Sequence, residues 1–149
     1  MKIITILLIV LGLIVAIFPQ FFTCQAHGMD IELPTGAHIP MVCLWTAHAE
    51  ACMGTLLVII GILLVFLRSR ETRLALSILA IFIGFAILIF PMGTATKPAF
   101  LWSIGVCTNP EHLCLEVMKP ALFLLGPIVM ATGAGGLVLN VIRRRQIER

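Results

Sequence analysis

The chain has 149 residues, of which 60% are hydrophobic and 11% are charged, and its mean hydropathy is +1.13. A soluble domain is about half apolar and a quarter charged, so this chain has too few charges to cover a surface exposed to water. The net charge of +3 does not indicate nucleic-acid binding, because the basic residues form short clusters beside apolar runs. The composition therefore indicates an integral membrane protein, and the length suits one domain over residues 1–149.

Four apolar segments are long enough to cross a bilayer as helices, which takes about 17–25 residues each. They cover residues 3–22, 44–67, 74–90 and 120–142. The first segment also has the form of a signal peptide, but no small-x-small cleavage site follows it, which favours a retained helix. The sequence therefore predicts an all-α, four-helix bundle in contact with the lipid bilayer.

Basic residues predict the orientation of this bundle. In a four-span protein, Lys2, the Arg68–Arg73 connection and the Arg143–Arg145 cluster all fall on one side of the membrane. The two long loops on the other side carry only Lys97 and Lys119. Because basic residues accumulate on the cytoplasmic side, we expect both termini in the cytoplasm and both long loops outside.

The first and third segments share a pattern of glycine and proline. Gly12 precedes Pro19 and Gly84 precedes Pro91 with the same spacing, and each segment leads through a loop with cysteines to another span. Two parallel helix hairpins, related by an axis along the membrane normal, would explain this pattern. Chance similarity between apolar segments that contain glycine and proline is the alternative.

Small residues predict where the helices approach one another, because helix packing in lipid depends on close backbone contact. Four pairs have the spacing of one helix face: Gly12 with Ala16, Ala80 with Gly84, Ala131 with Gly135, and Thr132 with Gly136. We interpret them as packing positions without chemistry.

All five cysteines fall in the predicted outer loops or just inside the membrane beneath them. Disulfides persist in such an oxidising compartment. The simplest pairing joins Cys24 to Cys43 and Cys107 to Cys114, so that each bond staples one loop, with Cys52 free in the membrane. Pairings between the loops remain open, because connectivity cannot be read from a sequence.

The start of the second span combines a carboxylate with small residues. On a helix, Cys43, Ala47, Glu50 and Gly54 form one face, and Thr46 borders it. A carboxylate in a membrane costs about 2.5–3.5 kcal/mol at the bilayer centre and normally has a partner. We expect Glu50 to form a structural hydrogen bond to another helix or to the backbone of a loop, with a proton, cation or substrate role as the alternative.

A second face of the same helix carries Trp45, His48 and Cys52. His48 and Cys52 are four residues apart and could share a metal ion or a haem, but the further ligands would have to come from the loops. They are therefore weak candidates, and the sequence predicts no cofactor, with haem or copper as the alternative. Trp45 and Trp102 are interpreted as interfacial anchors, because their amphipathic rings favour the membrane surface.

Motifs for catalysis are absent from the sequence. It contains no nucleotide-binding loop, no Ser-His-Asp set and no His-Glu-x-x-His motif, which favours a non-enzymatic protein. A thiol oxidoreductase that passes electrons from cysteine pairs to a quinone is the alternative, although no Cys-x-x-Cys is present to activate a thiol.

Several short motifs resemble the small prokaryotic membrane proteins grouped as domain of unknown function 4418. They are Cys43-x-Trp-Thr-Ala-x-Ala-Glu50, Ile104-Gly-Val-Cys107, Cys114 and Lys119-Pro-Ala-Leu122. The residue after the first cysteine is commonly histidine in that family and is Leu44 here, so a ligand at that place would have to be supplied by His48.

This resemblance implies four helices, no assigned activity and the plasma membrane of a prokaryote. It also implies an accessory subunit beside an ATP-binding-cassette permease and its ATPase.

Overall fold

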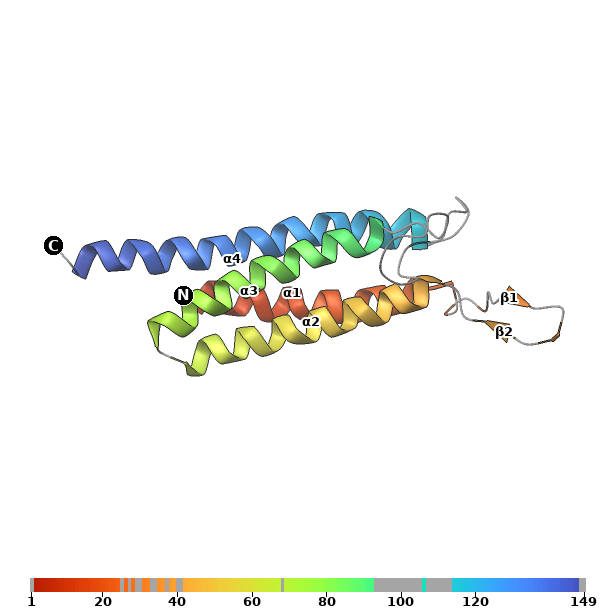
Figure 1. Cartoon of the computed structure of the whole chain (residues 1–149), viewed down its shortest axis with the longest axis horizontal. Helices are drawn as coiled ribbons and strands as arrows, with labels where there is room; N and C mark the ends of the chain where they lie inside the picture. Colours follow the sequence, from red (N-terminus) through yellow and green to blue (C-terminus); the bar gives the residue numbers. More distant parts are fainter. Residues whose placement is uncertain are drawn as a thin grey trace.

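Four long helices form the protein. The structure is a computed structural model, and it describes residues 2–24, 26, 28, 31–32, 35–36, 38–39, 42–67, 69–92, 106 and 114–147. The helices are α1 (Lys2–Phe21), α2 (Val42–Phe66), α3 (Arg70–Ile89) and α4 (Lys119–Ile147), and they run side by side (Figure 1). The 3₁₀ turn η2 (Phe90–Met92) ends α3, and the π-helical turn η3 (Cys114–Met118) leads into α4. The predicted all-α class is confirmed, and the described residues contain four helices that are apolar enough to span a membrane.

A small β-hairpin projects from one end of the bundle. Strand β1 (Ile31–Glu32) pairs antiparallel with β2 (His38–Ile39), so that Ile31 faces Ile39 and Glu32 faces His38. Gly36 between them has a φ of 76°, a conformation that glycine adopts without the steric cost of a side chain. The hairpin lies beyond the membrane-spanning helices (Figure 1).

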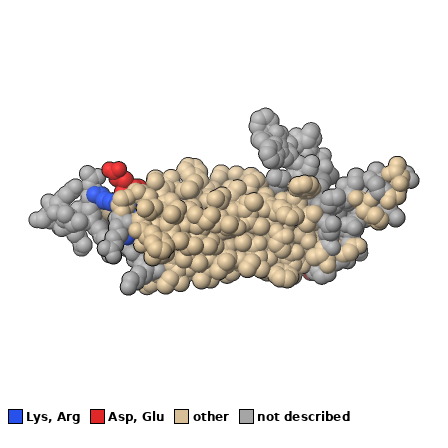
Figure 2. All heavy atoms as spheres, turned by 90° about the horizontal axis from the view of Figure 1, so that it is seen from below, with Lys and Arg blue, Asp and Glu red and all other residues tan. Residues whose placement is uncertain are grey.

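The surface of the bundle has the composition of a membrane protein. Each helix is long and apolar enough to span a bilayer, with spans at Ile3–Phe21, Cys43–Phe66, Arg70–Met92 and Cys114–Ile142. Figure 2 shows a band without acidic or basic side chains across the middle of the face that it draws. Exposing so many apolar side chains to water would be unfavourable. The outer faces of the helices are therefore suited to contact with lipid.

The two ends of the bundle differ in chemistry. At the arginine end, α1 begins, α4 ends, and Ser69 to Arg73 lead from α2 into α3 (Figure 1). The short connection holds the two helices antiparallel, with the Arg73 side chain donating to the carbonyl of Leu67 at 3.1 Å. The opposite end, the cysteine end, carries Cys24 and Cys114. Both termini therefore lie at the same end, as the sequence predicts for four spans.

Two hairpins build the bundle, and they repeat each other. In α1–α2, a Cβ atom on Gly12 would lie 2.9 Å from the backbone nitrogen of Val58. In α3–α4, a Cβ atom on Gly84 would lie 2.9 Å from the backbone nitrogen of Met130, and both residues stand 72 positions after their counterparts. The same shift relates two further pairs of contacts: Gly54–Ala16 to Gly126–Leu88, and Gly61–Ile9 to Gly133–Ile81. The predicted repeat is confirmed.

The hairpins pack with α1 against α4 and α2 against α3. A two-fold axis parallel to the helices exchanges α1 with α3 and α2 with α4, and therefore requires these two contacts together. The structure thus has the arrangement of parallel repeats related by an axis along the membrane normal.

Three of the four predicted small-residue faces lie inside the bundle. Gly12 and Ala16 contact Gly54, Ala80 and Gly84 are buried on α3, and Thr132 and Gly136 are buried on α4. The prediction for Ala131 and Gly135 is wrong. Ala131 is exposed, and a Cβ atom on Gly135 would meet nothing within 4 Å. Spacing alone could not show which side of α4 faces α3.

Candidate functional site

The end of α1 is fixed against α2. The Gln20 side chain donates a hydrogen bond to the backbone carbonyl of Ala47 at 2.9 Å. Two residues after α1, Thr23 is buried, and its hydroxyl donates to the carbonyl of Gln20 and accepts from the backbone N–H of Ala26. This turn directs the chain back over the end of the bundle and places Cys24 beside the start of α2.

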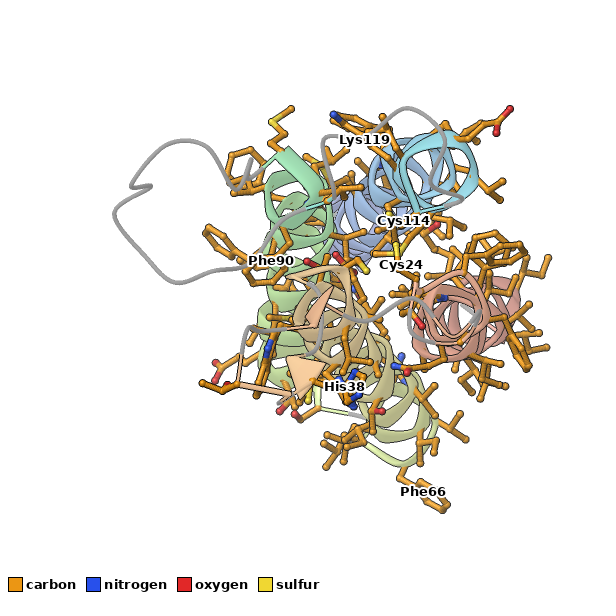
Figure 3. The ribbon with its side chains drawn as sticks, turned by 90° about the vertical axis from the view of Figure 1, so that its right-hand side faces the viewer. Cys24, His38, Phe66, Phe90, Cys114 and Lys119 are labelled. Atoms are coloured by element: carbon orange, nitrogen blue, oxygen red, sulfur yellow. The ribbon has the colours of Figure 1, made fainter. Side chains whose placement is uncertain are left out.

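Three thiols meet at this point. Cys24, Cys43 and Cys114 are all buried, and their Sγ atoms all lie within 4.8 Å of one another. The sulfurs of Cys24 and Cys114 are 3.4 Å apart, and the backbone N–H of Cys24 points at the Cys43 sulfur at 3.4 Å. Figure 3, which looks along the helices from the cysteine end, shows the Cys24 and Cys114 side chains directed at each other.

The structure contains no disulfide between Cys24 and Cys43, and the predicted pairing of these two residues stays a prediction. The prediction assumed that each loop is stapled to itself, whereas Cys24 contacts a cysteine of the other hairpin. Cys107, the predicted partner of Cys114, lies outside the described residues, and Trp102 does too.

Glu50 lies on the same buried face of α2 as Cys43. It is fully buried, and within the described part of the chain neither carboxylate oxygen has a hydrogen-bond partner. The predicted structural partner is therefore not present among those residues. Seven residues of helix separate Glu50 from Cys43, a rise of about 10 Å. Thr46 is fully buried between them, so Cys43, Thr46 and Glu50 form a polar column beneath the thiols.

The second hairpin has an apolar column in the equivalent place. A shift of 72 residues carries Cys43, Thr46 and Glu50 onto Leu115, Met118 and Leu122. Met118 and Leu122 are fully buried, as are Thr46 and Glu50. The bundle therefore accommodates apolar side chains at these positions, and its packing does not require the polar column.

The second predicted face of α2 points away from the thiols. Trp45, His48 and Cys52 are all exposed on the surface of the bundle. The His48 ring lies 2.9 Å from the carbonyl oxygen of Leu44 in its own helix, and 6.5 Å from the ring of Trp45. Neither His48 nor Cys52 belongs to the thiol cluster, and the predicted separation of α2 into two faces is confirmed.

The site thus joins a cluster of three thiols to one carboxylate. Thiolates bind soft metal ions, and two thiols in contact can also form a disulfide by giving up two electrons and two protons to an oxidant. Sequence reasoning identified Cys43 and Glu50 as one face but missed the cluster. The pattern of cysteines at the ends of three spans, all on one side of the membrane, was the available signal.

No curated protein and no solved structure matches the chain. A protein family described as domain of unknown function 4418 matches residues 8–139, a range that contains the three thiols and the polar column. The chain belongs to the domain of unknown function 4418 family.

Proposed function

We propose that this membrane protein is a non-enzymatic accessory subunit of an ATP-binding-cassette permease system and that the cysteine end is its working end. The observation that carries the proposal is the polarity of the interior. In the described part of the chain, the oxygens of Glu50 are the buried side-chain polar atoms without a hydrogen-bond partner. The buried groups that could react or bind a ligand, the three thiols and the Glu50 carboxylate, therefore lie toward the cysteine end of the bundle.

The buried polar groups nearer the arginine end support this view. Ser77, Thr132 and Asn140 each donate to a backbone carbonyl of their own helix, at 2.8, 2.7 and 2.9 Å. Between the ends, the core consists of apolar residues such as Leu8 and Leu57. A polar solute would find no hydrated path among these residues, so the chain is better suited to assisting a transporter than to being one.

Two properties of the sequence support an association with other subunits. It has no nucleotide-binding loop, so energy for transport would have to come from a separate ATPase. Positive charge at the arginine end favours that end in the cytoplasm, and in that orientation the thiols would lie on the outer side of a prokaryotic plasma membrane. There they would face the outer side of a permease.

Co-purification tests this proposal. The tagged full chain would be expressed in its own host, extracted in mild detergent and identified with its companions by mass spectrometry. We expect a permease and its ATPase to co-purify in stoichiometric amounts. As the control, an unrelated four-helix membrane protein with the same tag should be purified without them. Recovery of the chain alone from extracts in which permease complexes stay intact would contradict the accessory role.

A thiol-redox protein is the second candidate, because the 3.4 Å contact between the Cys24 and Cys114 sulfurs favours it. Oxidation would remove two electrons and two protons from the thiols and reduce a quinone to a quinol. Replacing Cys114 with serine would then trap a mixed disulfide between Cys24 and a substrate protein. Cysteines whose redox state never changes in cells with and without quinone would eliminate this candidate.

A further inference from the structure

A disulfide between two cysteines would not account for the arrangement of the three thiols. One disulfide consumes two sulfurs, whereas Cys24, Cys43 and Cys114 come from three separate segments and all converge within 4.8 Å. Cys24 follows α1, Cys43 lies in the first turn of α2, and Cys114 begins the π-helical turn before α4. Such single-turn π-helices occur frequently at functional sites.

We propose that Cys24, Cys43 and Cys114 bind one thiophilic metal ion of the class of Cu(I) and Zn(II). Thiolates select these ions over hard cations such as Mg²⁺ and Ca²⁺. The proposal concerns the working end named above, but it rests on the thiol geometry and not on the transporter partner.

The distances between the sulfurs suit such an ion. Metal–sulfur bonds are about 2.3 Å long, so three sulfurs around one ion stand about 4 Å apart. The Cys24 and Cys114 sulfurs are 3.4 Å apart, and no pair in the cluster exceeds 4.8 Å. Small rotations of the side chains are enough to reach the bound geometry. Each thiol that binds the ion releases its proton to solvent.

The surroundings of the cluster also favour the binding of a metal ion. The cluster is buried, which shields a bound ion from water. The carboxylate of Glu50, which has no hydrogen-bond partner among the described residues, lies about two turns beneath Cys43 on the same face. A buried carboxylate without a partner is costly in a membrane and marks sites for ions and protons.

The repeat shows that this chemistry is an addition to the fold. The second hairpin fills the equivalent positions with Leu115, Met118 and Leu122, and it makes the same helix contacts. Packing therefore does not explain why one hairpin carries a thiol, a hydroxyl and a carboxylate in a column. Metal binding by the three thiols accounts for the cysteine at the top of that column.

Metal titration of the purified full chain in detergent, reduced and kept free of oxygen, tests the proposal. Cu(I) and Zn(II) would each be added against a chromophoric chelator, with Cd(II) as a probe for thiolate-to-metal charge-transfer absorption. We expect one ion per chain. Each of C24S, C43S and C114S should weaken binding by more than about 100-fold, because even the loss of outer-shell groups costs 10–100-fold. C52S, which alters an exposed cysteine outside the cluster, is the matched control and should bind normally.

X-ray absorption on the unaltered protein keeps the test valid if a serine variant fails to fold. We expect three sulfur neighbours at about 2.3 Å, alone for Cu(I) and with a fourth ligand for Zn(II). Binding below one ion per chain, binding that survives loss of the cluster, or a shell of oxygen and nitrogen alone would overturn the proposal. None of these results depends on whether a permease co-purifies.

Discussion

The Sγ atoms of Cys24 and Cys114 lie 3.4 Å apart although 90 positions separate the two residues in the chain. Cys24 follows the first helix of one hairpin, and Cys114 precedes the last helix of the other. The contact therefore joins the two repeats at the cysteine end. Among the described cysteines, it also favours a disulfide between Cys24 and Cys114.

Mild oxidation should join Cys24 to Cys114 in preference to the loop-stapling pair Cys24 and Cys43. The two sulfurs need to approach only from 3.4 Å to the bond length of about 2.05 Å. The metal-free protein would be treated with diamide, digested without reduction and mapped by mass spectrometry. Cys52 is the internal control and should stay unpaired, because it is exposed on another face of α2. A dominant Cys24–Cys43 bond would contradict the arrangement described here.

Replacing Glu50 with leucine should leave the fold intact and raise the thermal stability of the protein. The equivalent position of the second hairpin already holds buried Leu122, and a buried carboxylate in a membrane is costly, up to about 2.5–3.5 kcal/mol at the bilayer centre and less toward the interface where Glu50 lies. The measurement is the unfolding temperature in detergent. L122E is the matched control and should lower it. A large loss of stability in E50L would mean that Glu50 has a structural partner after all.

Replacing Gly54 with alanine should destabilise the α1–α2 hairpin. The new Cβ atom would clash with the backbone nitrogen of Ala16, so one helix must move, and overpacking of this kind costs about 1–3 kcal/mol. G135A is the control, since its Cβ atom would meet nothing within 4 Å, and alanine favours helices by up to about 1 kcal/mol over glycine. Unfolding in a denaturing detergent compares the two variants. Equal stabilities would show that α1 and α2 do not approach this closely.

The proposed orientation predicts which end a membrane-impermeant maleimide reaches in intact cells. Thr35 in the β-hairpin and Ser69 at the arginine end are both exposed, so T35C and S69C can be compared in a C52S background. With basic residues in the cytoplasm, T35C should be labelled in intact cells and S69C only after the cells are lysed. The reverse pattern would place the thiols in the cytoplasm and remove the outer location from the proposed function.

Hydropathy and spacing determined the architecture of this protein without its coordinates. The four spans, the placement of both termini at one end and the repeat of Gly12 and Gly84 all follow from local patterns along the chain. A helix in lipid must bond its own backbone, so a long apolar run leaves few alternatives. Helical periodicity likewise separated the face of Glu50 from the face of His48 on α2.

Only the tertiary structure decided which cysteines meet. The cluster depends on how α4 is rotated about its axis and on the turn after Gln20, which directs Cys24 across the end of the bundle. Neither property is encoded in the spacing of one segment, because both arise from contacts between segments far apart in the sequence. For the same reason the sequence could not show that α4 turns Gly126 and Gly133, and not Gly135, toward α3.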